Sequence, residues 1–220
     1  MFILCLSFNN FVQSSIFVKY GTQTRIRNIS IRTVVRTIGQ NLCSSLLGMH
    51  AYTGCDTLSA KSGRGKISPL RIVKEHKAFQ DMFKLLGTDW ELSDNLFEKL
   101  QEFTCRMYCS RPQTNDINEL RYKLFCVRRE NIESIQLPPC ADCLCMHTLR
   151  ANYQAAVCKH RLQSRPVIPC PTSHGWNQDG TRVVIQWISW RPAPASVLEL
   201  LSCSCTRSCA LPCCSCLANS

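Results

Sequence analysis

Cysteine most constrains how this chain folds, because its 17 cysteines are odd in number and unevenly distributed. An odd number excludes complete disulfide pairing within one chain. Eleven of them are scattered along the chain, and we interpret these as structural side chains without a special function. The other six lie within the last 18 of the 220 residues. This distribution predicts a folded body in a reducing compartment, followed by a short cysteine-rich tail.

The tail cysteines have a spacing that is typical of thiolates sharing metal ions. Zn²⁺ takes four ligands in structural sites and prefers thiolates, so the tail predicts bound zinc, with a redox-labile thiol segment as the alternative. The expected ligands are Cys203, Cys205, Cys209, Cys213, Cys214 and Cys216. A second set, Cys140, Cys143, Cys145 and His147, also has metal-compatible spacing, but we interpret it as structural.

Positive charge is concentrated in the first third of the chain. Residues 1–78 hold 11 lysines and arginines against two acids, whereas the other 142 residues hold 15 against 13. Such a field favours a polyanionic partner, most simply a nucleic acid, although an ordinary basic surface would have the same composition. No stretch approaches the roughly 18 to 20 apolar residues of a membrane helix. The apolar run after Met1 lacks the preceding basic residue of a signal peptide.

Hydrophobic spacing predicts an α/β or α+β fold. We expect strands at residues 2–6, 16–18, 29–31 and 183–190. We expect helices at 34–50, from an N-cap at Ser68 onward, and at 79–86, 92–107, 117–125 and 147–162. The expected order is a domain over 1–135, an accessory segment over 136–195 and the tail over 196–220. His50 lies on the apolar side of its helix and is interpreted as a core histidine.

A glycine-rich basic loop separates two of the predicted helices. Residues 46–57 read LLGMHAYTGCDT, and GRGK follows at 63–66. Glycine lets backbone amides approach a phosphate closely, and the N-terminus of the next helix adds positive charge. The loop therefore predicts a phosphate contact, with a solvated helix-capping loop as the alternative. The expected nucleic-acid-binding residues are Gly63, Arg64, Gly65, Lys66, Ser68 and Arg71.

These blocks resemble a family of uncharacterised proteins associated with transposable elements, which carry an HA[FL]TGCDT…GxGK signature. The resemblance continues through NELRYKLF at 118–125, LPP at 137–139, HTLRANYQ at 147–154 and HGW at 174–176. More distantly, GCD at 54–56 followed by GRGK is similar to the core of flap-endonuclease-like nucleases of the PIN superfamily. The tail resembles one half of a CXC (tesmin/TSO-like) motif, a module that binds zinc and DNA in its complete form.

The PIN-like resemblance implies a role for Asp56. In those nucleases the corresponding aspartate belongs to a carboxylate cluster that holds Mg²⁺ or Mn²⁺, and the glycine hairpin grips duplex phosphates. Here no acid precedes Asp56, and the next one is Glu75. Because one carboxylate does not make a two-metal site, we expect a truncated or degenerate PIN-like domain that has no enzymatic activity and keeps Asp56 as a catalytic remnant.

The sequence thus predicts an intracellular, nuclear protein of mobile-element origin that binds nucleic acid, with DNA expected, and that has no membrane partner. Two alternatives remain open. One is an active, divalent-metal-dependent, structure-specific nuclease whose other carboxylates come from Glu75, Asp81 or a partner chain. The other is a zinc-stabilised protein-interaction module that does not bind nucleic acid. The oligomeric state is left open.

Overall fold

The computed structural model of the chain describes residues 2–8, 13–22, 24–61, 63–128, 136–161 and 163–188. Met1–Trp187 forms one compact unit, to which residues 188–220 do not belong. The six tail cysteines and the end of the strand expected at 183–190 lie outside the described residues. Bound zinc in the tail therefore stays a prediction.

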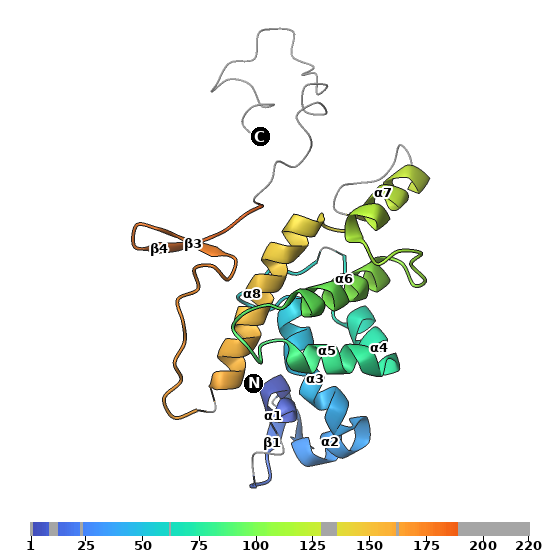
Figure 1. The fold of residues 1–220 in the computed structure, drawn as a ribbon. Coiled ribbons are helices and arrows are strands. Elements are labelled where there is room, and N and C mark those ends of the chain that lie inside the picture. The colour runs from blue at the N-terminus through green and yellow to red at the C-terminus, as the bar shows by residue number, and fades with distance from the viewer. Residues whose placement is uncertain are drawn as a thin grey trace. The chain divides into compact units, whose positions relative to one another are not determined.

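The first unit combines α-helices with two small antiparallel hairpins, which makes it an α+β fold (Figure 1). The helices are α1 (Phe2–Ser7), α2 (Ile31–Ile38), α3 (Gln40–Tyr52), α4 (Ile67–Glu75), α5 (Lys77–Leu85), α6 (Asp94–Tyr108), α7 (Ile117–Arg128) and α8 (Ala141–His160). The hairpins pair β1 (Phe17–Thr22) with β2 (Arg25–Ser30), and β3 (Trp176–Asp179) with β4 (Arg182–Ile185). None of the described helices combines the length and the apolar character needed to cross a membrane.

Helix α3 is the centre of the unit, and α1, α5 and α8 pack against it. Apolar and small residues of α3 lie on all sides of the helix. Nine of its 13 residues are therefore buried, as expected for a helix without a solvent face. Gly48 allows the close approach of α5, because a Cβ atom there would lie 2.3 Å from the carbonyl oxygen of Phe83. A larger residue at this position would separate the two helices.

The core beside α3 is aromatic. The ring of Tyr52 lies 5.8 Å from that of Phe83 and 6.2 Å from that of Phe103, and Phe103 lies 5.2 Å from Phe79, all measured between centroids. The buried Tyr52 hydroxyl donates to the Leu100 carbonyl over 3.2 Å and pairs with the Thr104 hydroxyl at 2.6 Å. The end of α3 is thus fixed to α6 by polar as well as apolar contacts.

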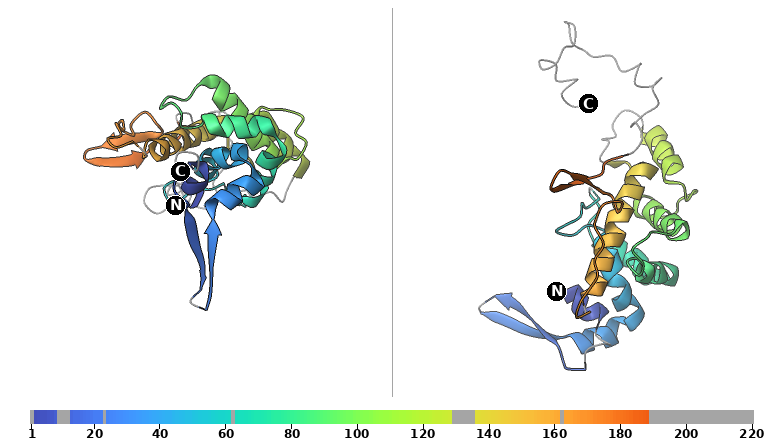
Figure 2. Two further views of the ribbon diagram at one scale, coloured as in Figure 1. Left: turned by 90° about the horizontal axis from the view of Figure 1, so that it is seen from below. Right: turned by 60° about the vertical axis from the view of Figure 1, so that its left-hand side comes forward.

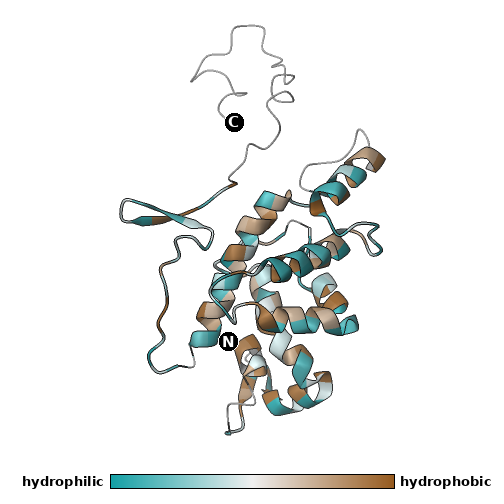
Figure 3. Cartoon of the chain, viewed as in Figure 1, coloured by the Kyte–Doolittle hydropathy of each residue, from teal (hydrophilic) through white to brown (hydrophobic). Residues whose placement is uncertain are grey.

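The strand expected at residues 2–6 is wrong: these residues form helix α1. A short apolar run fits either a buried strand or a buried helix, and no neighbouring strand lies beside this one among the described residues. Leu6 is buried in the core, and the Ser7 hydroxyl donates to the carbonyl of Cys43 on α3 over 3.0 Å. Figure 3 shows α1 as a predominantly hydrophobic helix.

Other boundaries are also corrected. The single helix expected at 34–50 is two helices that meet at Gly39. Ser68 is not an N-cap, because α4 begins at Ile67 with Lys66 in the capping position. The helices expected at 79–86, 92–107 and 117–125 are confirmed as α5, α6 and α7.

The compact unit continues through the expected boundary at residues 135 and 136. Helix α8 packs on α3 and α6, so the expected accessory segment shares the core of the first domain. The hairpin of β3 and β4 is held to α8 by Arg150, whose guanidinium donates to the carbonyls of Gly175 and Gln186, each over 3.1 Å.

Asn152 on α8 satisfies three backbone groups of the turn after α5. Its carbonyl oxygen accepts from the amide of Gly87 at 2.7 Å, and its amide donates to the carbonyls of Asp89 and Trp90, each at 2.9 Å. Gly87 has a φ of 77° and lies against the backbone of α8, where a Cβ atom would lie 2.4 Å from the Ala156 nitrogen. The turn therefore requires both glycine and this asparagine.

We expect Asn152→Ala to destabilise the unit, because it leaves three backbone groups near the core without partners. The loss should be about 2–4 kcal/mol in the free energy of unfolding, measured by urea denaturation. Gln154→Ala on the same helix is the matched control and should change this free energy by less than about 0.5 kcal/mol. Equal effects of the two variants would contradict the role assigned to Asn152.

Candidate nucleic-acid interface

The C-terminal end of α3 and the loop after it are held by basic side chains. Lys66 Nζ donates to the carbonyls of His50 (3.2 Å) and Gly54 and to the Thr53 hydroxyl (3.1 Å). Two further donors, Lys61 Nζ at 3.3 Å and His147 Nε2 at 2.7 Å, reach the carbonyl of Tyr52. Carbonyls at the end of a helix lack intrahelical partners and carry partial negative charge, so cationic donors stabilise them.

We call Lys66, Lys61 and His147 together the α3 cap. Two of these donors, Lys61 and His147, are desolvated. Lys61 Nζ lies 3.8 Å from the centroid of the buried Tyr52 ring, and burial lowers the pKa of Lys61 to about 7. Burial lowers the pKa of His147 to about 3, and the positive charge of Lys61 acts in the same direction. His147 is therefore neutral, and its Nε2–H group donates a hydrogen bond to the Tyr52 carbonyl. His147 is structural, as expected, and serves as a hydrogen-bond donor in the core.

The six residues of the predicted phosphate-binding loop divide into two groups. Gly63, Gly65, Ser68 and Arg71 are exposed. Lys66 is occupied by the α3 cap, and the Arg64 guanidinium lies over the Tyr108 ring, 4.7 Å from its centroid. In this arrangement Lys66 is not the mobile counter-charge that the glycine-rich sequence predicts.

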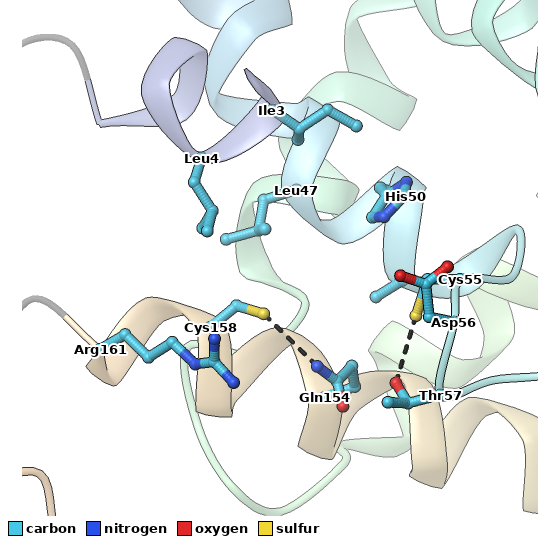
Figure 4. Close-up of a pocket in the computed structure, with 11 residues that line it drawn as sticks. Ile3, Leu4, Leu47, His50, Cys55, Asp56, Thr57, Gln154, Cys158 and Arg161 are labelled. Carbon is cyan, nitrogen blue, oxygen red and sulfur yellow. Dashed lines mark hydrogen bonds between the residues drawn. The ribbon is translucent and has the colours of Figure 1, made fainter. Parts of the chain in front are cut away.

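Asp56 lies on a cavity of about 380 Å³ between α1, α3, α8 and the loop after α3 (Figure 4). Its polar lining includes His50, Asp56, Gln154 and Arg161, with Cys55 and Cys158 beside them. Figure 4 shows His50 and Asp56 on one side of the cavity and Arg161 on the other. The apolar wall comes from α1 and α3, so the helix at 2–7 also shapes this cavity.

His50 lies at this cavity and differs from the core histidine that we expected. Its Nδ1 atom is buried and has no hydrogen-bond partner among the described residues. Burial lowers the pKa of His50, the nearby Lys66 ammonium lowers it further, and Asp56 opposes both effects. On balance these surroundings favour the neutral form of His50.

The cavity does not fit the Mg²⁺ or Mn²⁺ pair that the PIN-like resemblance implies. These ions require several oxygen ligands, whereas the cavity lining supplies one carboxylate, that of Asp56, and also contains the Arg161 guanidinium. Within the described ranges no three histidine, cysteine or acidic side chains are grouped to hold a metal ion. The surroundings of Asp56 therefore give no basis for a metal-assisted step.

Sequence reasoning missed a second basic feature, the hairpin of β1 and β2. All five lysines and arginines of the first 55 residues are exposed, and this segment contains no acid. They lie on the hairpin and on α2 and are Lys19, Arg25, Arg27, Arg32 and Arg36. Figure 2 shows the hairpin extending away from the helices of the unit. The signal was the alternation of Arg25 and Arg27 after Gly21-Thr22, with Lys19 before it, in a segment without acids.

The hairpin is rooted in the unit at its base. Val18 and Ile16 pack against the core, and Ile31, the first residue of α2, is fully buried. The amide of Ile31 donates to the Ile16 carbonyl over 3.0 Å, and the Ser30 hydroxyl accepts from the Thr33 amide to begin α2. Strand β2 passes into α2 without a loop, so the helix sets the direction of the hairpin.

Comparisons of the chain with protein-family models, curated proteins and solved structures find no match. A proposal of function therefore rests on the sequence, the geometry and the charge of the molecule itself.

We expect Lys66→Met to loosen the end of α3 without removing a surface charge that matters for ligand binding. The free energy of unfolding should fall by about 1–2 kcal/mol, because three oxygen acceptors lose a charged donor. The pKa of His50, followed by NMR, should rise, since the Lys66 charge lowers it. Lys74→Met on exposed α4 is the control; an identical His50 titration in both variants would count against the cap.

His147 should make the unit sensitive to acid. Its pKa is about 3 in the folded protein against 6.5 for a free histidine, so the unfolded chain binds the proton first. The stability from His147 is complete above pH 6.5 and is lost progressively toward pH 3, by up to about 1.4 kcal/mol per pH unit. His147→Gln keeps a donor but does not titrate. Its unfolding free energy should therefore depend less on pH in this window, and parallel curves would refute the assignment.

Proposed function

We propose that this protein binds nucleic acid through the phosphate backbone, using the basic surface of β1, β2 and α2. The observation that carries the proposal is the exposure of five basic side chains in a 55-residue segment without an acid. A field of one sign attracts a polyanion and releases its condensed counterions on binding, which supplies affinity without base recognition.

The ion pairs of the unit lie away from this surface. The three ion pairs of the described residues join Lys84 to Asp81, Arg106 to Glu102 and Lys123 to Glu119. All three lie outside the first 55 residues, so the cations of the hairpin and α2 have no ion-pair partner in the described part of the chain. Arg32 donates one hydrogen bond to the Gln13 carbonyl over 3.2 Å, and its other guanidinium N–H groups, together with the other four cations, are available to phosphates.

We include the exposed part of the glycine-rich loop in the proposed phosphate-binding surface. Gly63, Gly65, Ser68 and Arg71 are accessible to a phosphate, and Lys66 keeps the loop in place. The sequence blocks around this loop support a mobile-element origin and a degenerate PIN-like ancestry, and DNA binding would agree with a nuclear location. The active-nuclease alternative gains no support from the cavity at Asp56, and the zinc-module alternative depends on residues outside the described ranges.

Binding to a 20-base-pair DNA duplex, followed by fluorescence anisotropy, tests the proposal. Affinity should fall steeply between 50 and 200 mM salt, with a slope of about −0.9 in log K against log salt for each phosphate contacted. Neutralising Arg25, Arg27, Arg32 and Arg36 to glutamine should reduce the magnitude of that slope by about 3–4 and weaken binding at 50 mM salt at least about tenfold.

The matched control removes the same charge elsewhere, by replacing the exposed Lys99, Arg111, Arg165 and Arg182 with glutamine. We expect its salt slope to stay within about 1 of the unmodified protein. The absence of binding to any nucleic acid at 50 mM salt would refute the proposed function. An affinity that does not depend on salt would refute it as well.

A further inference from the structure

We propose that the hairpin of β1 and β2 enters the major groove of duplex DNA, with one of its two faces toward the base edges. This inference rests on the proposed function and names the ligand class and the element that recognises it.

The register divides the hairpin into two chemically different faces. Residues directly opposite each other share a face, and successive residues alternate between faces. Tyr20 lies opposite Arg27, and Thr22 lies opposite Arg25, so these four residues form one face, which we call the Tyr20 face. Toward the base of the hairpin, the same face continues with Val18 and Ile29, which are partly buried.

The Tyr20 face has the groups that read base edges. Arginine pairs with the O6 and N7 acceptors of guanine, threonine hydroxyls bond to base edges, and apolar surface contacts the thymine methyl group. Arg25 and Arg27 are two residues apart on one strand, so their Cα atoms are about 6.8 Å apart. That distance equals about two base-pair steps along the duplex, which lets the two guanidinium groups reach bases in one groove.

The dimensions of the hairpin also fit. Six paired residues in each strand span about 20 Å, and the two backbones lie about 5 Å apart. The major groove of B-DNA is about 12 Å wide and admits a two-stranded ribbon, whereas the major groove of A-form RNA is too deep and narrow for side chains to read. The hairpin therefore favours duplex DNA over duplex RNA.

The exposed aromatic and apolar residues need a covering partner, and the charge identifies it. Tyr20 is 69% exposed, although the hairpin has no second layer among the described residues, and Phe17 (61%) and Ile26 (49%) are exposed on the opposite face. A second copy of this chain packed on the Tyr20 face would bring Arg25 and Arg27 against identical cations. A polyanion covers the same surface with opposite charge, so DNA is the occupant we assign.

The test compares Tyr20→Ala with Tyr122→Ala on α7, because both tyrosines are 69% exposed. With a 20-base-pair DNA duplex at fixed salt, Tyr20→Ala should weaken binding about tenfold and Tyr122→Ala less than about twofold. Arg25→Gln with Arg27→Gln should weaken it at least about tenfold, since each base-edge pair contributes about that factor. Arg165→Gln with Arg182→Gln removes two exposed charges elsewhere and is the control for charge.

Two further readouts locate the hairpin on the duplex. Bound protein should protect guanine N7, a major-groove atom, from methylation by dimethyl sulfate, and Tyr20→Ala should remove that protection. An RNA duplex of the same sequence should bind more weakly than the DNA. If the unmodified protein binds neither duplex, the proposed function itself fails.

Retained binding combined with equal effects of the two tyrosine variants, unprotected guanine N7 or equal RNA affinity would overturn the groove inference alone. Self-association of the free protein that Tyr20→Ala abolishes would identify a second copy as the occupant and would overturn it as well.

Discussion

The carbonyl groups at the C-terminal end of α3 lack partners within the helix, and Lys66, Lys61 and His147 donate to them. This cap joins the central helix to the loop after it and to α8, which lies far along the chain. Because α3 carries the contacts to α1, α5 and α8, the position of its last turn affects the whole unit. The aromatic core around Tyr52 and the cavity at Asp56 both lie beside this cap.

The cap also divides the basic residues of the first third into two groups with different roles. Lys61 and Lys66 are committed to backbone carbonyls, and Arg64 to the Tyr108 ring. The cations of β1, β2 and α2 have no ion-pair partner among the described residues and point to an external anion. The net charge of the segment thus combines a structural part and a part available for binding. Composition alone does not separate the two.

Sequence periodicity predicted much of the helical part of the fold, because long amphipathic segments such as α5 and α6 have one clear apolar face. It failed at residues 2–6, where an apolar run fits either a strand or a helix, and only packing against α3 decides. The sequence motif in the loop predicted that Lys66 binds phosphate. It could not show that Lys66 donates to backbone carbonyls instead, because a motif does not reveal which carbonyls lie near a lysine in the fold. The sequence did not identify the hairpin at Tyr20 as a site, because that role depends on how far the hairpin extends away from the rest of the unit.

The central claim is that the hairpin and α2 form the nucleic-acid interface, while the loop at Lys66 is mainly structural. Titration of isotope-labelled protein with a DNA duplex, followed through backbone amide chemical shifts, tests it directly. We predict the largest shifts at residues 17–22 and 25–36, with smaller shifts at 63–66. The largest shifts at 63–66 or around Asp56, with the hairpin unperturbed, would contradict the account.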